Sequence, residues 1–139
     1  MIYCIFIGSF KDKRLQQLVR EYHRRLTRLW PVTLVELPEK DKEIAGWLKA
    51  KQNKGILVSL DAHGEAMDSM AFTKWVTQNP RDLYFLAWGA GGPPQATLLE
   101  GMKSLSLSPM TYSHELARVL LMEQLYRAGA VLRGHPYPK

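Results

Sequence analysis

Short apolar runs that alternate with helical patterns are the feature that most restricts the fold of this chain. Apolar residues recur at helical spacing in segments 15–29, 44–51 and 70–78, and a further helix is expected after Ser113. Strands and helices that alternate in this way predict a three-layer α/β domain with a mostly parallel sheet. Four runs are almost continuously apolar, as strands buried on both faces are, and a Ser/Leu alternation is a fifth strand candidate: Ile2–Ile7, Val32–Leu37, Ile56–Leu60, Leu83–Trp88 and Ser104–Ser108.

Length and composition narrow the class of protein further. A chain of 139 residues without an internal repeat or a long linker predicts a single domain over residues 1–139. Nineteen Lys and Arg against thirteen Asp and Glu give a net charge of +6, which favours polyanionic partners such as nucleic acid. The single cysteine, Cys4, lies in an apolar run and cannot form an internal disulfide. Without a leader pattern or an apolar run of about 20 residues, the sequence predicts a cytoplasmic protein with no membrane span.

Three loops follow predicted strands at the end where open α/β sheets bind their ligands. They read SLDAHG, GAGGPPQ and SLSPMTYSH. In the first loop, Asp61 fits a turn residue and a ligand contact equally well. The glycines of the second loop allow the backbone to approach a ligand. However, the loop is not GxGxxG and no GKS or GKT follows, so alone it is typical of an ordinary turn.

The third loop is the richest in reactive side chains and leads into the last helix. Ser113 is placed to cap that helix, with Glu115 in its first turn. Apolar residues surround most of the helix, so it must be buried against the sheet, a partner helix, or both. Five of the seven residues from 108 to 114 are polar: Ser108, Thr111, Tyr112, Ser113 and His114.

Charged residues on the last helix allow several roles. His114 and Arg118 are four residues apart and therefore share one face. His114 fits a surface or capping residue as well as a catalytic one. Arg118 has apolar neighbours and needs an anion, either Glu115 or one brought by a ligand. Glu123 is expected to pair with the arginine four residues later.

Two further features are basic. Arg20, Arg24 and Arg28 form a stripe on the first helix, which fits a solvated face and a footprint on a nucleic-acid backbone equally well. The segment GHPYPK contains Tyr137, which can stack on a base, and Lys139, which can meet a phosphate. A frayed terminus is the alternative for this segment.

Longer motifs make a family resemblance specific. The run SLSPMTYSHELARVLLMEQLYRA and the later GHPYPK are similar to the C-terminal signature of the RlmH family. EYHRRL, VELPE, LDAHGEAMDS and FLAWGAGG follow the order and approximate spacing of that family, so the resemblance covers essentially the whole chain. RlmH proteins are SPOUT-class methyltransferases that methylate N3 of a pseudouridine in large-subunit ribosomal RNA.

The resemblance implies a trefoil knot over about residues 83–130, a tail over 131–139, and a homodimer that shares its pockets between subunits. It implies S-adenosylmethionine as the cofactor and no metal. The small size of the chain, which leaves no separate RNA-binding module, favours the assembled ribosome over free RNA as the partner. The cofactor-contacting positions are then Leu60, Gly89, Leu107, Ser108, Pro109, Met110, Thr111 and Tyr112. The catalytic candidates are Arg118, His114, Tyr137 and Lys139, and the RNA-binding candidates are Arg20, Arg24, Arg28, Arg118 and Lys139.

The chain departs from the family at several places: Gly91 stands where a polar or acidic residue is frequent, the segment between Leu37 and Ile56 is short, and two further departures bear directly on the site. Pro138 follows Tyr137 where the family usually has a histidine, so that imidazole is missing. Trp88 stands where a first glycine is common, and its ring either narrows the cofactor cleft or points into the core. These departures leave alternatives: an RNA- or ribosome-binding protein with impaired catalysis, a methyltransferase for another base, or a flavodoxin-like binder of nucleotide or flavin.

Overall fold

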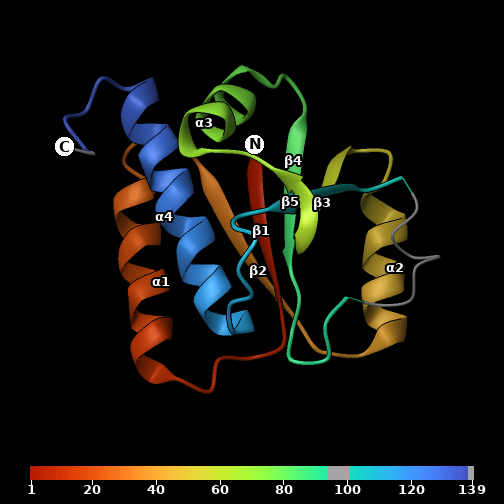
Figure 1. Cartoon of the computed structure of the whole chain (residues 1–139). Helices are drawn as coiled ribbons and strands as arrows, with labels where there is room; N and C mark the ends of the chain where they lie inside the picture. The colour runs from red at the N-terminus through yellow and green to blue at the C-terminus, as the bar shows by residue number, and fades with distance from the viewer. Residues whose placement is uncertain (94–100, 138–139) are drawn as a thin grey trace.

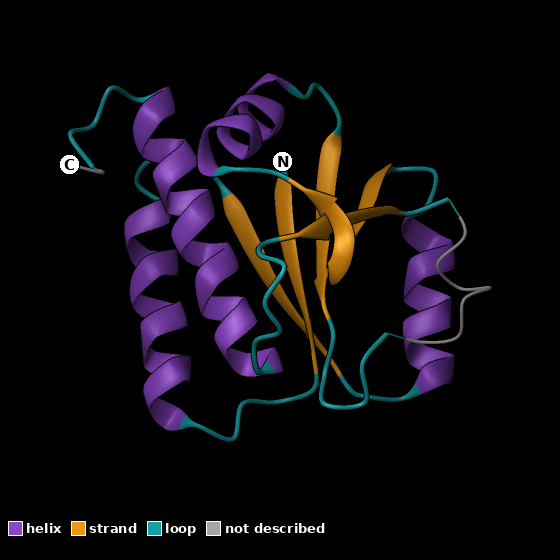
Figure 2. Cartoon of the chain, in the orientation of Figure 1, coloured by secondary structure: helices purple, strands orange, loops and turns teal. Residues whose placement is uncertain are grey.

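A computed structural model of the chain describes residues 1–93 and 101–137. Its described part is a parallel sheet of five strands in the order β2-β1-β4-β3-β5, with four helices (Figures 1 and 2). The predicted α/β class with a parallel sheet is therefore confirmed. The elements are β1 Ile2–Ile7, α1 Lys13–Leu26, β2 Val32–Leu37, α2 Asp41–Lys51, β3 Gly55–Ala66, α3 Ser69–Gln78, β4 Asp82–Ala87, β5 Lys103–Ser106 and α4 His114–Leu132.

Helices cover both faces of the sheet, which makes the three predicted layers. Figure 2 shows helices on both sides of the sheet. On β1, Cys4 and Phe6 belong to the core under α1, α3 and α4, while Ile5 and Ile7 belong to the core under α2. Successive side chains of a strand point to opposite faces, so a strand buried on both sides must be apolar throughout. This explains why the strand runs showed no polar alternation.

The last helix, α4, lies between α1 and α3 (Figure 1). Its side chains Leu121, Met122 and Leu125 are fully buried. The helix contacts both the sheet and the neighbouring helices, which are the two kinds of burial that its apolar circumference predicted. Gly129 permits a close approach, because a Cβ there would lie 2.9 Å from the indole nitrogen of Trp30. None of the described helices is long and apolar enough to cross a membrane.

Two strands differ from their predicted bounds by more than one residue at an end, whereas β4 is shifted by a single residue. β3 continues beyond Leu60 to Ala66, and β5 is shifted from the predicted 104–108 to Lys103–Ser106. The pairing of β3 with β5 breaks its register between Leu60 and Glu65, so residues 61–64 bulge from the ladder. The backbone N–H of His63 donates to Asp61 Oδ1 at 2.9 Å, a local turn bond that favours this bulge. Polar bulged residues carry no strand periodicity, so the sequence did not predict the extension.

The knot predicted for about 83–130 includes residues 94–100, which lie outside the described residues, so the knot stays a prediction.

Candidate functional site

A first cleft of about 530 Å³ opens at the edge of the sheet where the strands end. The bulge of β3 and the loops after β4 and β5 form it, and these are the three segments that the rule for open α/β sheets predicted. Its lining residues within the described part of the chain include no Lys or Arg. They are Leu60, Asp61, Ala62, His63, Ala87, Trp88, Gly89, Ala90, Gly92, Pro93, Leu105, Leu107, Ser108, Met110, Thr111, Tyr112, Ser113, His114 and Ala117.

The structure brings together seven of the eight residues predicted to contact a cofactor. The exception is Pro109, which lies in the same loop but does not line the cleft. The loop holds its own shape, because Ser106 Oγ donates to the Ser108 carbonyl at 2.8 Å and Ser108 Oγ accepts from the Met110 N–H at 3.1 Å. Asp61 also lines the cleft, although its hydrogen bond to His63 shows that it is a turn residue as well.

Trp88 points into the core rather than across the cleft. Its side chain is buried among apolar residues under α2, and its indole Nε1 donates to Ser59 Oγ at 2.7 Å. This buried bond satisfies the polar end of the ring, as buried tryptophans require. Of the two alternatives for Trp88, the structure shows the second.

Glu39 is a residue that the sequence analysis missed. Its Oε2 accepts the backbone N–H of Gly91 at 3.0 Å, and a Cβ at Gly89 would lie 2.7 Å from the same carboxylate. The carboxylate therefore fixes the glycine loop, and a side chain at Gly89 would displace the Glu39 carboxylate from this position. Glu39 lies in VELPE, far along the chain from this loop, and no spacing connected the two.

A second cleft of about 550 Å³ adjoins the first, since Ala90 and His114 border both. Its other walls come from the loop after β1 and the loop after β2. The further lining residues are Ile7, Gly8, Ser9, Lys11, Glu36, Leu37, Pro38 and Glu39.

Arg118 lies beneath the ends of the strands, and its exposed fraction is 0%. Its Nη2 donates to the Ile7 carbonyl at 2.7 Å, and its guanidinium lies 5.1 Å and 4.7 Å from the ring centres of Phe6 and Phe10. Burial lowers the pKa of Arg118. Nearby carboxylates, of which Glu115 has the largest effect, partly oppose this shift. A buried side chain cannot touch RNA, so the expected direct RNA contact by Arg118 does not fit this structure.

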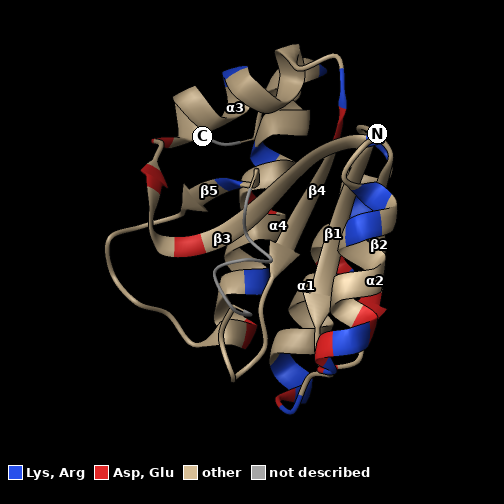
Figure 3. Ribbon diagram, turned by 90° about the vertical axis from the view of Figure 1, so that its right-hand side faces the viewer, with Lys and Arg blue, Asp and Glu red and all other residues tan. Residues whose placement is uncertain are grey.

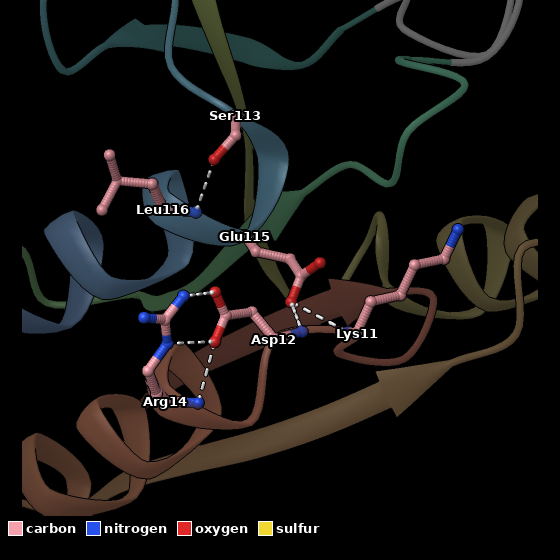
Figure 4. A network of polar contacts seen from close by, with 6 residues as sticks. All are labelled: Lys11, Asp12, Arg14, Ser113, Glu115 and Leu116. Carbon is pink, nitrogen blue, oxygen red and sulfur yellow. Dashed lines mark hydrogen bonds and ion pairs between the residues drawn. The ribbon is translucent and has the colours of Figure 1, made fainter.

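Glu115 does not pair with that arginine but joins two helix starts (Figure 4). Its Oε1 accepts the backbone N–H of Lys11 at 2.9 Å and of Asp12 at 3.0 Å. Asp12 in turn caps α1 by accepting the Arg14 N–H, and Ser113 caps α4 by accepting the Leu116 N–H, as predicted for Ser113. The loop after β1 is thereby tied to the first turn of α4.

The tail lies at the opposite end of α4 from the clefts. In Figure 1 α4 begins at the bottom and the chain ends at the upper left. Tyr137 donates to Glu123, packs 4.6 Å from the Tyr126 ring, and lies under Arg127. Burial, and then the bond to Glu123, raise the pKa of the Tyr137 phenol well above its usual range. Glu123 and Arg127 pair at 3.3 Å, which confirms that prediction.

One chain therefore does not bring its catalytic candidates together. Tyr137 contacts Glu123 and Tyr126, which lie nine and twelve residues after His114, and at about 1.5 Å per residue this places it roughly 14–18 Å from His114 along the helix axis. Pro138 and Lys139 lie outside the described residues.

The predicted basic stripe is exposed at Arg20, Arg24 and Arg28, of which Arg28 lies in the turn after α1. Arg24 is paired with Glu21 at 2.7 Å, which raises its pKa and offsets part of its charge. α2, on the other face, carries both signs of charge (Figure 3). Within residues 1–93 and 101–137, no three His, Cys, Asp or Glu side chains are grouped to hold a metal ion.

Known methyltransferases match this chain over nearly its whole length. A family model described as "Predicted SPOUT methyltransferase" matches residues 1–138. The protein named ribosomal RNA large subunit methyltransferase H from Solibacter usitatus is 37% identical, over 98% of this chain and 97% of that protein.

Solved structures share the fold at low sequence identity. A probable methylase family protein from Haemophilus influenzae has a TM-score of 0.64 and 11% identity, over 99% of this chain and 70% of that one. The SpoU methyltransferase AviRb from Streptomyces viridochromogenes, solved in complex with AdoMet, has a TM-score of 0.54 and 14% identity, over 90% of this chain and 56% of that one.

Proposed function

Because this chain belongs to the SPOUT methyltransferase family, we propose that it transfers the methyl group of S-adenosylmethionine to large-subunit ribosomal RNA. The finer part of the proposal is that the acceptor is N3 of a pseudouridine, methylated on the assembled ribosome by a cytoplasmic homodimer. The observation that carries the proposal is the first cleft, which gathers seven of the eight expected cofactor residues at the ligand-binding edge of the sheet.

The residues of the first cleft suit S-adenosylmethionine chemically. Leu60, Leu107 and Met110 offer apolar walls for an adenine ring, and the loop backbones offer donors and acceptors for its polar edges. A volume of about 530 Å³ lies within the range of about 300–1,000 Å³ that small-molecule sites occupy. The absence of Lys and Arg from the described lining matters because the cofactor carries a positive sulfonium, which a nearby cation would repel.

Once bound, the cofactor supplies a methyl carbon that is open to nucleophilic attack. The acceptor N3 lies between two carbonyl groups and carries a proton, so it is a poor nucleophile until that proton leaves. In the balanced reaction N3 loses its proton to an acceptor and bonds to the methyl carbon, while the C–S bond breaks to leave a thioether.

Protein groups therefore have to favour the deprotonated base and hold it in line. His114 borders both clefts and can hydrogen-bond a base there. The buried charge of Arg118 stabilises an anion at this edge through the electric field, without contact.

A second copy of the chain would supply the tail. Tyr137 lies at the far end of α4 from its own cleft, so it reaches a cleft only in another subunit. Apolar side chains beside the first cleft support a covering partner, because Met110 is 70% exposed and Tyr112 and Leu116 are each 36% exposed. In this arrangement Tyr137 orients the base and Lys139 meets RNA, while Arg20, Arg24 and Arg28 contact the RNA backbone.

The test has a binding arm and a transfer arm. Calorimetric titration with S-adenosylmethionine should give heat, and Gly89→Val should abolish it, because a branched side chain on this cleft-lining glycine displaces the Glu39 carboxylate that holds the loop. Labelled methyl transfer should modify large subunits from cells that lack the modification, with mass spectrometry locating the methyl group on N3. No heat and no transfer by the unmodified protein would refute the proposal, and transfer to another base would refute its finer part.

Subunit mixing tests the shared pocket. Gly89→Val and Tyr137→Ala should each be inactive alone and regain activity when mixed, because one mixed site then has an intact cleft and an intact tail. Mixtures that remain inactive would contradict a tail supplied by the second copy.

A further inference from the structure

The second cleft has no role in the function proposed above, yet it adjoins the first. Its volume is about 550 Å³, and Ala90 and His114 form the border between the two clefts. Any molecule bound in the second cleft therefore lies next to one bound in the first. The volume is of the size that small-molecule sites have, about 300–1,000 Å³, so a nucleoside fits in it.

The walls of the second cleft present hydrogen-bond donors and acceptors together. Lys11 contributes an ammonium, and Glu36 and Glu39 contribute carboxylates. Glu39 already accepts the Gly91 N–H, whereas Glu36 accepts no hydrogen bond from the described residues. A uracil-type base alternates carbonyl oxygens with N–H groups along its edge, so it needs both kinds of partner at once.

Gly8 lies in the wall of the second cleft and separates the cleft from the buried guanidinium of Arg118. A Cβ at Gly8 would lie 3.9 Å from Arg118 Nη2 and 3.3 Å from Glu39 Oε1. Arg118 Nε and Nη1 are buried and have no hydrogen-bond partner within residues 1–93 and 101–137. A guanidinium that is so incompletely compensated favours negative charge nearby, and it does so strongly because water is excluded.

We propose that the second cleft binds the acceptor base, with Glu36 accepting a base N–H and Lys11 donating to a base carbonyl. Arg118, beneath Gly8, then acts as a positioning residue for charge, because its incompletely compensated guanidinium favours negative charge on the bound base. The proposal rests on the proposed methyl transfer, and it divides the edge of the sheet into a cofactor cleft and a base cleft that meet at His114.

Base binding can be measured without catalysis. In NMR titrations of the full chain with uridine, pseudouridine and adenosine, the two uracil-type nucleosides should shift the amide signals of Gly8, Ser9 and Ala90. Ser9→Trp fills the cleft and should abolish these shifts. Adenosine should shift the first-cleft signals of Leu107 and Tyr112 instead.

Transfer kinetics supply the second readout. Glu36→Gln should lower kcat/KM for large subunits by roughly tenfold or more, as expected when a charged hydrogen-bond acceptor is neutralised. Ser9→Trp should lower it by about a hundredfold, the cost of a displaced reacting group. Both variants should keep the Kd for S-adenosylmethionine within about twofold. Glu43→Gln, an exposed change of the same kind on α2 outside both clefts, should leave both quantities unchanged.

Several results would overturn the proposal. Full transfer by Ser9→Trp, an equal loss in Glu43→Gln, or weakened cofactor binding in both cleft variants would each show that the acceptor base lies elsewhere. Failure of the unmodified protein to bind S-adenosylmethionine would refute the methyl-transfer function instead. In that case the nucleoside titration still decides whether the second cleft is a base site.

Discussion

Replacing Glu115 with alanine is expected to lower the free energy of unfolding by about 3 kcal/mol, because two charge-assisted hydrogen bonds disappear. Glu115 Oε1 accepts the N–H groups of Lys11 and Asp12 at 2.9 Å and 3.0 Å (Figure 4). Hydrogen bonds to charged groups contribute about 1.5–3 kcal/mol each. Since both contacts are only partly buried, the low end of that range applies to each.

Glu115→Gln is the matched control for this prediction. The amide oxygen has the same reach but no charge, so it retains neutral hydrogen bonds of about 0.5–1.5 kcal/mol each and the loss falls to about 1 kcal/mol. Comparison of the two variants therefore separates the loss of the acceptor from the loss of its charge.

Urea unfolding followed by tryptophan fluorescence measures both variants, since the chain has 4 tryptophans. Protein concentration must be equal throughout, because association stabilises the folded state. A stability of Glu115→Ala within about 0.5 kcal/mol of the unmodified chain, the range of ordinary surface substitutions, would refute the reasoning. Equal losses in the two variants would show that charge, rather than geometry, holds the loop.

Three further predictions concern the core and the basic face. Trp88→Phe removes the buried bond to Ser59 and should lower the unfolding free energy by about 1–2 kcal/mol in urea; no loss would contradict a net contribution from this bond. Burial raises the pKa of the Cys4 thiol, so this thiol stays protonated in the folded chain above about pH 8.5, where it ionises in the unfolded chain. Stability should therefore fall as pH rises past that value, by up to about 1.4 kcal/mol per pH unit. Cys4→Ala should lack this component, and identical pH profiles of unfolding would contradict it. Arg20→Ala combined with Arg28→Ala should raise KM for ribosomal substrate and flatten its salt dependence without changing the Kd for S-adenosylmethionine, and an unchanged salt slope would identify a merely solvated face.

Local sequence patterns were sufficient where one element decides its own structure. The unbroken apolar character of β1 and β4 predicted burial on both faces, because a strand with one wet face alternates. The Ser113 cap and the pair between Glu123 and Arg127 were predictable for the same reason, since partners within one helical turn need no tertiary information.

The candidate site was only partly predictable. The strand-end rule identified the three loops of the first cleft, and the family resemblance identified most of its lining. The sequence did not show contacts between distant segments. Glu39 contacts the glycine loop, and Glu115 contacts the loop after β1. Arg118 shows the limit most clearly, because its position four residues after His114 predicted a shared face but not that its guanidinium is fully buried.

By itself, the sequence determined the alternation of elements, the burial of the sheet and the edge at which the first cleft lies, since hydrophobic periodicity records which face of each element avoids water and so where each strand ends. The order of the strands was decided only by the tertiary structure. This order places the ends of β1 and β2 beside the glycine loop, and the second cleft lies between them. Tertiary structure also decided the environment of Arg118, because its aromatic neighbours Phe6 and Phe10 lie more than a hundred residues away in the chain. Burial of a charge depends on the groups that gather around it in space, and periodicity along one helix does not record them.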